Sequence, residues 1–204
     1  MAQSQLPPNH HADHPGFSGA AGLIAALSMS VGRKSDARLA ECLAELHPGD
    51  KAVDLGCGPG VAVRYAASHG ALVTGIDPAP IMLRIARLLT RHPSTVQYLE
   101  GVAEDIPLPE HSVSIAWSIA TVHHWGEVDA GLREVRRVLV PAGRFVAIER
   151  ETKPGAKGHA SHGWSPQQAA DFMERCRELG YSDVRMEQAT AGRRSTISVM
   201  ARAL

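Results

Sequence analysis

The sequence predicts an α/β fold: a doubly wound, mostly parallel sheet of about seven strands that ends in an antiparallel hairpin. Two observations support this prediction. Short apolar runs typical of strands alternate with helical patterns between residues 51 and 149. After one more helical pattern, two further apolar runs follow with only a short link between them. Because strands separated by helices join through right-handed crossovers, the alternating part should form a parallel sheet covered on both faces.

The helices and strands of the first half follow from apolar spacing and turn residues. A helical pattern over residues 37–46 ends at the turn-forming sequence HPGD, residues 47–50. The alternation then predicts strand 51–55, helix 61–69, strand 71–76, helix 80–91 and strand 96–99.

The second half continues the same alternation. Ser165 and Pro166 are typical first residues of a helix, and Gly180 is a typical stop. Residues 151–163, rich in Gly, Lys and His, are expected to form a mobile loop. The elements predicted here are strand 113–118, helix 128–139, a turn at 141–143, strand 144–149, helix 165–179, and strands 184–188 and 195–201.

Length and charge limit the domain number and the partners. A chain of 204 residues suits one domain, so we expect a flexible arm over residues 1–17 and a single domain over residues 18–204. Lys plus Arg and Asp plus Glu each number 21, which gives a formal net charge of zero. A neutral chain has no global field that attracts nucleic acid or anionic lipid, so neither is an expected partner.

The cysteines and the N-terminal apolar stretch bear on location. Cys42, Cys57 and Cys176 are widely spaced without a CxxC pair, which argues against disulfides and structural zinc and favours the cytoplasm. The apolar stretch at residues 19–31 is too short to span a membrane and lacks a basic segment before it. It is interpreted as a helix.

A glycine-rich loop is the strongest functional signal. The sequence DLGCGPG, residues 54–60, falls where the first strand meets the next helix, and glycine there lets the backbone approach a ligand closely. Asp77 ends the second strand, 21 positions after Gly56, where an acid in such folds binds two ribose hydroxyls. A dinucleotide site needs a sixth-position glycine, but Val61 stands there. The pattern therefore predicts a Rossmann-like site for a mononucleoside cofactor.

The chain resembles the class I S-adenosylmethionine-dependent methyltransferases, specifically the small-molecule subgroup called type 11. The resemblance spans residues 51–149 and rests on the segments VDLGCGPG, GIDPAP, GVAEDIPLP, WSIATVHHW and LREVRRVLVPAGRFVAIE. It implies an enzyme that moves a methyl group from S-adenosylmethionine to a small-molecule acceptor.

By this resemblance the glycine loop binds the methionine part of the cofactor, Asp77 binds its ribose and Pro78 lies against its adenine. Val102 stands where the family usually has an Asp that accepts a hydrogen bond from the adenine amino group, and Glu104 or Asp105 could substitute. The cofactor-binding residues that follow are Asp54, Gly56, Cys57, Gly58, Gly60, Asp77, Pro78, Ala103, Glu104 and Ser118.

Two histidines follow the fourth strand. In the family the first His of a similar pair is common at this place, which makes His123 the candidate for orienting or deprotonating the acceptor. A packed side chain bonded to the backbone is an equally weighted interpretation. Because adjacent side chains of a strand point to opposite sides, His124 is expected to face elsewhere. His159 and His162 can be grouped with this pair, but neither spacing specifies a metal site, so no metal is predicted.

Several alternatives stay open. A non-catalytic S-adenosylmethionine-binding protein is favoured only by Val102, and a nucleotide-dependent oxidoreductase is disfavoured by Val61. Trp164 and the loop before it either contact the substrate or form an ordinary connection. The helix expected within residues 19–31 either covers the cofactor or packs against a second copy in a homodimer.

Overall fold

The computed structural model describes residues 34–91, 93–155 and 162–204. The expected arm at residues 1–17, the expected helix within 19–31 and His159 lie outside the described residues. No helix in the described part of the chain is both long enough and apolar enough to cross a membrane.

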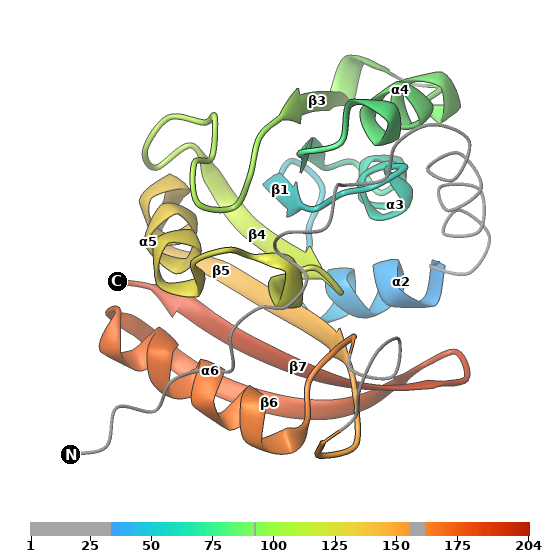
Figure 1. Ribbon diagram of the computed structural model, residues 1–204. Coiled ribbons are helices and arrows are strands. Elements are labelled where there is room, and N and C mark those ends of the chain that lie inside the picture. Colours follow the sequence, from blue (N-terminus) through green and yellow to red (C-terminus); the bar gives the residue numbers. More distant parts are fainter. Residues whose placement is uncertain (1–33, 92, 156–161) are drawn as a thin grey trace.

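One seven-stranded sheet forms the centre of the molecule, with the strand order β3-β2-β1-β4-β5-β7-β6 (Figure 1). Strands β1 to β5 pair in parallel, and β7 runs antiparallel to both β5 and β6. The predicted mostly parallel α/β sheet with its terminal hairpin is therefore confirmed. The strands are β1 Lys51–Leu55, β2 Leu72–Asp77, β3 Val96–Glu100, β4 Val113–Ile119, β5 Leu139–Arg150, β6 Tyr181–Ala191 and β7 Arg194–Ala203.

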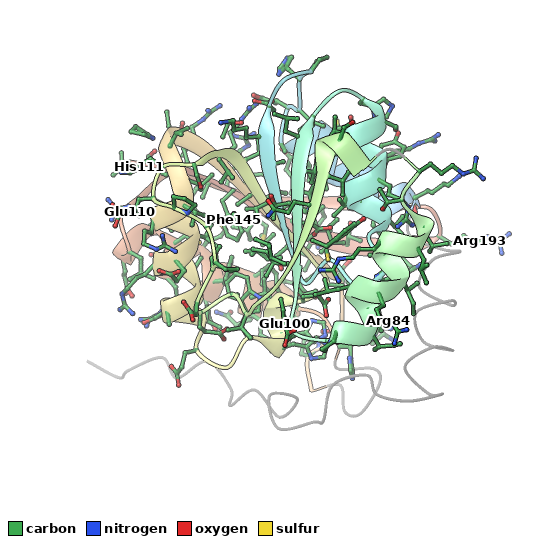
Figure 2. The ribbon with its side chains drawn as sticks, turned by 90° about the horizontal axis from the view of Figure 1, so that it is seen from above. Arg84, Glu100, Glu110, His111, Phe145 and Arg193 are labelled. Atoms are coloured by element: carbon green, nitrogen blue, oxygen red, sulfur yellow. The ribbon has the colours of Figure 1, made fainter. Side chains whose placement is uncertain are left out.

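Helices cover both faces of this sheet, so the fold has three layers (Figure 1). One face carries α2 Lys34–Leu43, α3 Val61–Ser68 and α4 Pro80–Leu89, whose buried alanines and valines form a core with Trp117. The other face carries α5 Val128–Val138 and α6 Pro166–Glu178, which pack over Phe145. Figure 2 shows Phe145 in the interior and Arg84 on the outer side of α4. Two short 3-10 helices, η1 Pro93–Thr95 and η2 Val122–His124, complete the structure.

Strand β5 begins earlier than the sequence pattern predicts. Its pairing with β4 jumps from Val113 opposite Leu139 to Ile115 opposite Arg144, and Ala142 has a φ of 62°. The predicted turn at residues 141–143 is thus a bulge inside one longer strand, because the flanking residues on both sides keep their hydrogen bonds to β4.

The strand order places the site. After β1 the chain adds β2 and then β3 on one side, and it returns to add β4 on the other side of β1. In open α/β sheets this reversal leaves a crevice beyond the carboxyl ends of the strands, where ligands bind. The glycine loop and the segment after β4 both begin at this edge, since Leu55 and Ser118 are direct partners in the sheet.

Candidate functional site

The glycine loop is fixed to the end of β4 by Thr121. The Thr121 hydroxyl donates to the Leu55 carbonyl over 2.9 Å and lies 2.5 Å from the hydroxyl of Ser118. Gly56 has a φ of 73°, and a Cβ at this position would collide with the Thr121 side chain. The loop therefore requires glycine here for both its backbone conformation and its close contact. Sequence reasoning missed Thr121, although it lies only two residues beyond β4.

Ser118 lies beneath this contact and is fully buried. Its hydroxyl bond to Thr121 gives it a supporting role in the loop, and its cofactor contact stays a prediction.

Asp77 joins the second strand to the glycine loop. Its carboxylate is buried and accepts hydrogen bonds from the backbone amides of Gly58, over 2.8 Å, and Ala79, over 2.9 Å. Burial raises the pKa of this carboxyl, while the two amide bonds act in the opposite direction without cancelling the shift. A carboxylate can accept about four hydrogen bonds, so two amides leave capacity for two ribose hydroxyls. Asp77 and the loop thus fit the nucleoside that the sequence predicts.

Cys57 and Asp54 lie at the base of the same loop and are buried. Burial raises the pKa of the Cys57 thiol well above its usual range, and the nearby carboxylates of Asp54 and Asp77 raise it further. The thiol therefore stays protonated at neutral pH. A neutral thiol is a poor nucleophile, so Cys57 contributes shape and not reactivity.

Two of the residues considered at the adenine are exposed, and the other two are packed against or hydrogen-bonded to the protein itself. Pro78 is exposed, and Val102 is 43% exposed. The Ala103 side chain is packed in the core on the side of α5. A carboxylate oxygen of Glu104 accepts from the backbone amide of Glu127 over 3.1 Å, at the start of α5, where a negative charge favours the helix. Glu104 therefore has a structural partner, and its adenine role stays a prediction.

His123 is held by a carboxylate that sequence reasoning did not single out. Glu149, fully buried in β5 one residue before its end, accepts from the His123 ring: its Oε2 lies 2.8 Å from Nδ1. Its other oxygen accepts from the His123 backbone amide over 3.4 Å. With the carboxylate as acceptor Nδ1 carries the hydrogen, and in the neutral tautomer the lone pair then lies on Nε2. The available signal was position, since Glu149 lies at the end of β5 and His123 follows the neighbouring parallel strand β4, which ends at the same edge of the sheet.

The prediction that His124 faces away from His123 is wrong. The two ring centroids are 4.0 Å apart, and the His162 ring lies 5.3 Å from the first and 5.6 Å from the second. The cause is local: β4 ends at Ile119, and both histidines belong to η2. Successive residues of a 3-10 helix are separated by about 120° and not by the 180° of a strand.

Trp164 is a core residue. Its side chain is buried, and its ring centroid lies 4.7 Å from that of Phe172 in α6. Its backbone bonds to Arg150 and Thr152, which fixes the returning end of the loop beside β5. Of the two interpretations of Trp164, this favours an ordinary structural connection.

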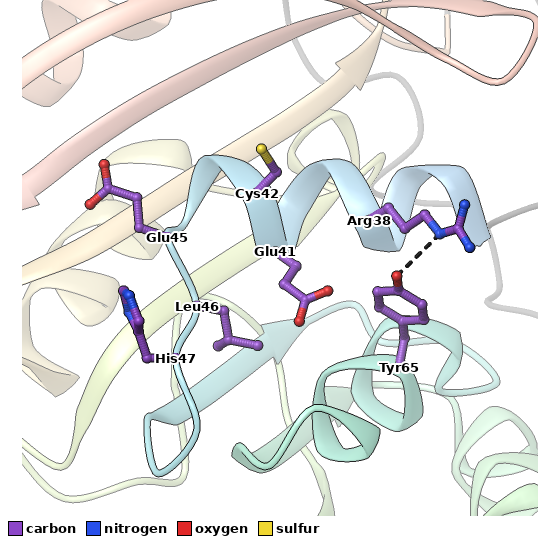
Figure 3. Close-up of a pocket in the computed structure, with 7 residues that line it drawn as sticks. All are labelled: Arg38, Glu41, Cys42, Glu45, Leu46, His47 and Tyr65. Carbon is purple, nitrogen blue, oxygen red and sulfur yellow. Dashed lines mark hydrogen bonds between the residues drawn. The ribbon is translucent and has the colours of Figure 1, made fainter.

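A separate hollow of about 610 Å³ lies along α2 and α3 (Figure 3). Arg38 and Tyr65 are bonded across it, the Arg38 Nε donating to the Tyr65 hydroxyl over 3.1 Å. It shares no residue with the site at the strand ends, so it is not the expected cofactor site. Its lining is Arg38, Glu41, Cys42, Glu45, Leu46, His47 and Tyr65.

Comparison with known sequences agrees with this geometry. Residues 53–147 match the family described as methyltransferase domain, type 11. Malonyl-[acyl-carrier protein] O-methyltransferase of Serratia marcescens is 35% identical over 138 residues, 66% of this chain and 51% of the relative. Demethylmenaquinone methyltransferase of Corynebacterium kroppenstedtii is 34% identical over 105 residues, 52% of this chain and 44% of the relative. The chain thus spans about half the length of these curated relatives.

Solved structures share the fold. A chain in the complex between the Haloferax volcanii Trm112 methyltransferase activator and a methyltransferase aligns with a TM-score of 0.75, 22% identity, and 88% and 93% of the two chains covered. An S-adenosylmethionine-dependent methyltransferase from Aquifex aeolicus aligns with a TM-score of 0.71, 20% identity, and 89% and 98% covered.

Fold and geometry together define an α/β protein with a candidate nucleoside site at the carboxyl edge of its parallel strands. The sequence match agrees with this: residues 53–147 are similar to the type 11 methyltransferase domain, and the sheet has the fold of solved S-adenosylmethionine-dependent methyltransferases.

Proposed function

We propose that the protein transfers a methyl group from S-adenosylmethionine to a small-molecule acceptor. The observation that carries the proposal is the assembly of three features at one edge of the sheet: the glycine loop, the Asp77 carboxylate and the His123–Glu149 pair. Thr121 joins them, since it bonds to the end of β1 and lies two residues before His123.

The cofactor is proposed to lie across the ends of β1 and β2. Asp54 and the glycine loop, with Gly56, Cys57, Gly58 and Gly60, face its methionine part. Asp77 binds the ribose hydroxyls, and the exposed Pro78 lies against the adenine. When bound, the cofactor supplies a methyl group already activated by its sulfonium, so the protein has chiefly to position the acceptor and exclude water.

His123 is proposed to contact the acceptor. Glu149 holds the ring in one orientation through Nδ1, which leaves Nε2 able to accept a hydrogen bond from an acceptor hydroxyl. The names of two relatives give two different acceptors, malonyl-[acyl-carrier protein] for one and demethylmenaquinone for the other. One of these acceptors is carried on a protein and the other is a free molecule, so the two names fix no single compound, and we propose a small, partly apolar acceptor.

The test combines cofactor binding with methyl transfer. Calorimetry should detect S-adenosylhomocysteine and no NAD, and an Asp77→Ala variant should bind S-adenosylhomocysteine at least tenfold more weakly because it loses charge-assisted bonds to the ribose. The wild-type protein and the Asp77→Ala variant are then each incubated with a radiolabelled methyl donor and metabolite extracts. Label should enter the small-molecule fraction only with the wild-type protein.

Other outcomes of these experiments would contradict different parts of the proposal. Binding without label transfer across extracts would favour the non-catalytic alternative, and label in nucleic acid or protein would contradict the small-molecule acceptor. NAD binding with no response to S-adenosylhomocysteine would overturn the proposal.

A further inference from the structure

We propose that His123, His124 and His162 together bind one divalent transition-metal ion of the zinc type. One imidazole nitrogen from each of these side chains lies within 4.8 Å of the others. Residues 123 and 124 come from η2, whereas residue 162 belongs to the segment that leads to α6. Three histidines from two separate segments thus converge at one point of the carboxyl edge.

The donor set selects the kind of metal. Neutral imidazole nitrogens suit zinc, copper and nickel, whereas magnesium and calcium prefer oxygen ligands. Three histidines with a fourth open position are a known arrangement for accessible zinc. Zn–N bonds of about 2.0–2.1 Å in a tetrahedron put the nitrogens roughly 3.3 Å apart. The nitrogens would therefore move together by roughly 1.5 Å at most, and one of the three rings, that of His124, is exposed.

A buried carboxylate already orients one of the three ligands. Glu149 accepts from Nδ1 of His123 over 2.8 Å and is fully buried, so it directs the Nε2 lone pair of that ring. A carboxylate behind a metal-binding histidine fixes the ring tautomer and raises its basicity. A buried carboxylate beside the three rings also favours a divalent cation over an anion at this point.

The backbone fixes the third ligand close to the other two. The backbone amide of Trp164 donates to the Arg150 carbonyl over 2.9 Å, and the Trp164 carbonyl accepts from the Thr152 amide over 2.8 Å. These two bonds hold residue 164 beside the end of β5, as in a pair of strands. His162 lies two residues before Trp164, and Glu149 lies one residue before Arg150. The same edge of β5 therefore positions a ligand and its supporting carboxylate.

The open fourth position would take an oxygen donor, and we infer that this is a polar group of the acceptor, which the metal would then hold in place of a direct hydrogen bond to Nε2 of His123. This last step rests on the proposed function. The proposal of metal binding does not rest on the proposed function, because zinc affinity is measured without cofactor and without acceptor.

The test is zinc binding by competition with a chromophoric chelator. The sequence also holds His10, His11 and His14, which lie outside the described residues and could bind zinc themselves. All proteins are therefore the full chain with these three changed to Ala. In this background we expect one Zn²⁺ per chain and no competition by Mg²⁺. His124→Ala and His162→Ala should each weaken zinc affinity at least tenfold. Co²⁺ should give the visible absorption of a tetrahedral site only when all three histidines are present.

The matched control is His47→Ala. His47 is exposed and lies beside Asp50 in the turn before β1, so its removal should leave zinc affinity unchanged. Circular dichroism checks that each variant is folded. Equal zinc affinity in the background protein and both histidine variants would overturn the proposal, as would the absence of stoichiometric binding. If the protein binds zinc but shows no methyl transfer, that result would count against the proposed function and leave the zinc proposal standing.

Discussion

Asp77 is a buried carboxylate whose titration is expected to link cofactor binding to pH. Its two amide bonds favour the charged form, yet burial dominates and the pKa stays above the ordinary value of 3.8. The neutral form is therefore favoured in the folded protein relative to the unfolded chain. The stabilising effect of Asp77 is complete below the ordinary pKa, and it is lost as the pH rises through the raised pKa.

The same shift predicts that cofactor affinity falls in mild acid. Two ribose hydroxyls are bound best by the ionised carboxylate, so affinity for S-adenosylhomocysteine should decrease as the pH falls through the raised pKa. Calorimetry between pH 7 and pH 4 measures this decrease. Asp77→Asn cannot ionise and serves as the control: its affinity should be lower throughout and should lack the decrease due to Asp77. Parallel pH profiles of the two proteins would contradict the assignment.

Gly58 allows backbone strain to be separated from ligand contact. It has a φ of 52°, and a Cβ there would meet nothing within 4 Å, which is also true of Gly49, whose φ is 90°. Gly58→Ala and Gly49→Ala should each cost roughly 1–2 kcal/mol of unfolding free energy, because a side chain is strained in this conformation. Only Gly58→Ala should weaken S-adenosylhomocysteine binding, since its methyl group would enter the proposed cofactor space. Urea unfolding and calorimetry check both, and equal binding losses would exclude direct contact at Gly58.

Sequence patterns alone could not identify some residues of the candidate site. The glycine loop and Asp77 could be proposed from the sequence because both are recognised by their positions relative to the first two strands, and the structure bonds them to each other. Glu149 acts through His123, far away in the sequence, and only its place at the end of a strand could have pointed to it. His162 could be grouped with the histidine pair, but its spacing in the sequence did not show that the rings meet. Thr121 was missed because an ordinary Thr gives no signal until Gly56 is seen packed against it.

At the scale of elements, the start of α6 was readable from sequence alone. Ser165 accepts from the Gln168 amide over 3.3 Å, and the Gln168 side chain accepts from the Ser165 amide over 2.8 Å, which forms a capping box. Ser and Pro act on the first turn of the helix and the closing Gly on its last turn, so these signals do not depend on contacts with distant residues.

This cap predicts a measurable loss of stability. Ser165→Ala removes the acceptor for the Gln168 amide and should cost about 1 kcal/mol, which lowers the melting temperature by roughly 2–4 °C. Ser68→Ala is the control: Ser68 is exposed, and its hydroxyl donates to a carbonyl of its own helix α3. Its effect should stay within about 0.5 kcal/mol. Calorimetric melting of both variants tests the cap, and similar losses would show that it contributes little.

Element boundaries were less predictable than element types. The first strand was predicted over the residues that form β1, whereas β5 extends back through the bulge at Ala142 to Leu139. The sequence PAG signals a turn, but pairing with β4 outweighs that local preference. The same limit explains the error at His124, where the chain leaves β4 at Ile119 and winds into η2 before the histidines.

At the scale of the whole molecule, the site depends on the sheet as a unit. Asp77 ends β2, Gly56 follows β1, Thr121 follows β4, and Glu149 precedes the end of β5. A ligand that contacts several strand ends binds the folded chain and has no comparable site on the unfolded one. Cofactor binding must therefore stabilise the entire domain by mass action.

Thermal unfolding measures this coupling without any knowledge of the acceptor. S-adenosylhomocysteine at 100 times its dissociation constant should add about 2.7 kcal/mol to the unfolding free energy. For a chain of this size that corresponds to a rise in melting temperature of roughly 5–11 °C. NAD at the same concentration should leave the melting temperature unchanged, because Val61 replaces the sixth-position glycine that a dinucleotide site needs. Asp77→Ala should lose most of the rise while melting cooperatively on its own. A shift with NAD equal to that with S-adenosylhomocysteine would show that the site does not distinguish a mononucleoside from a dinucleotide.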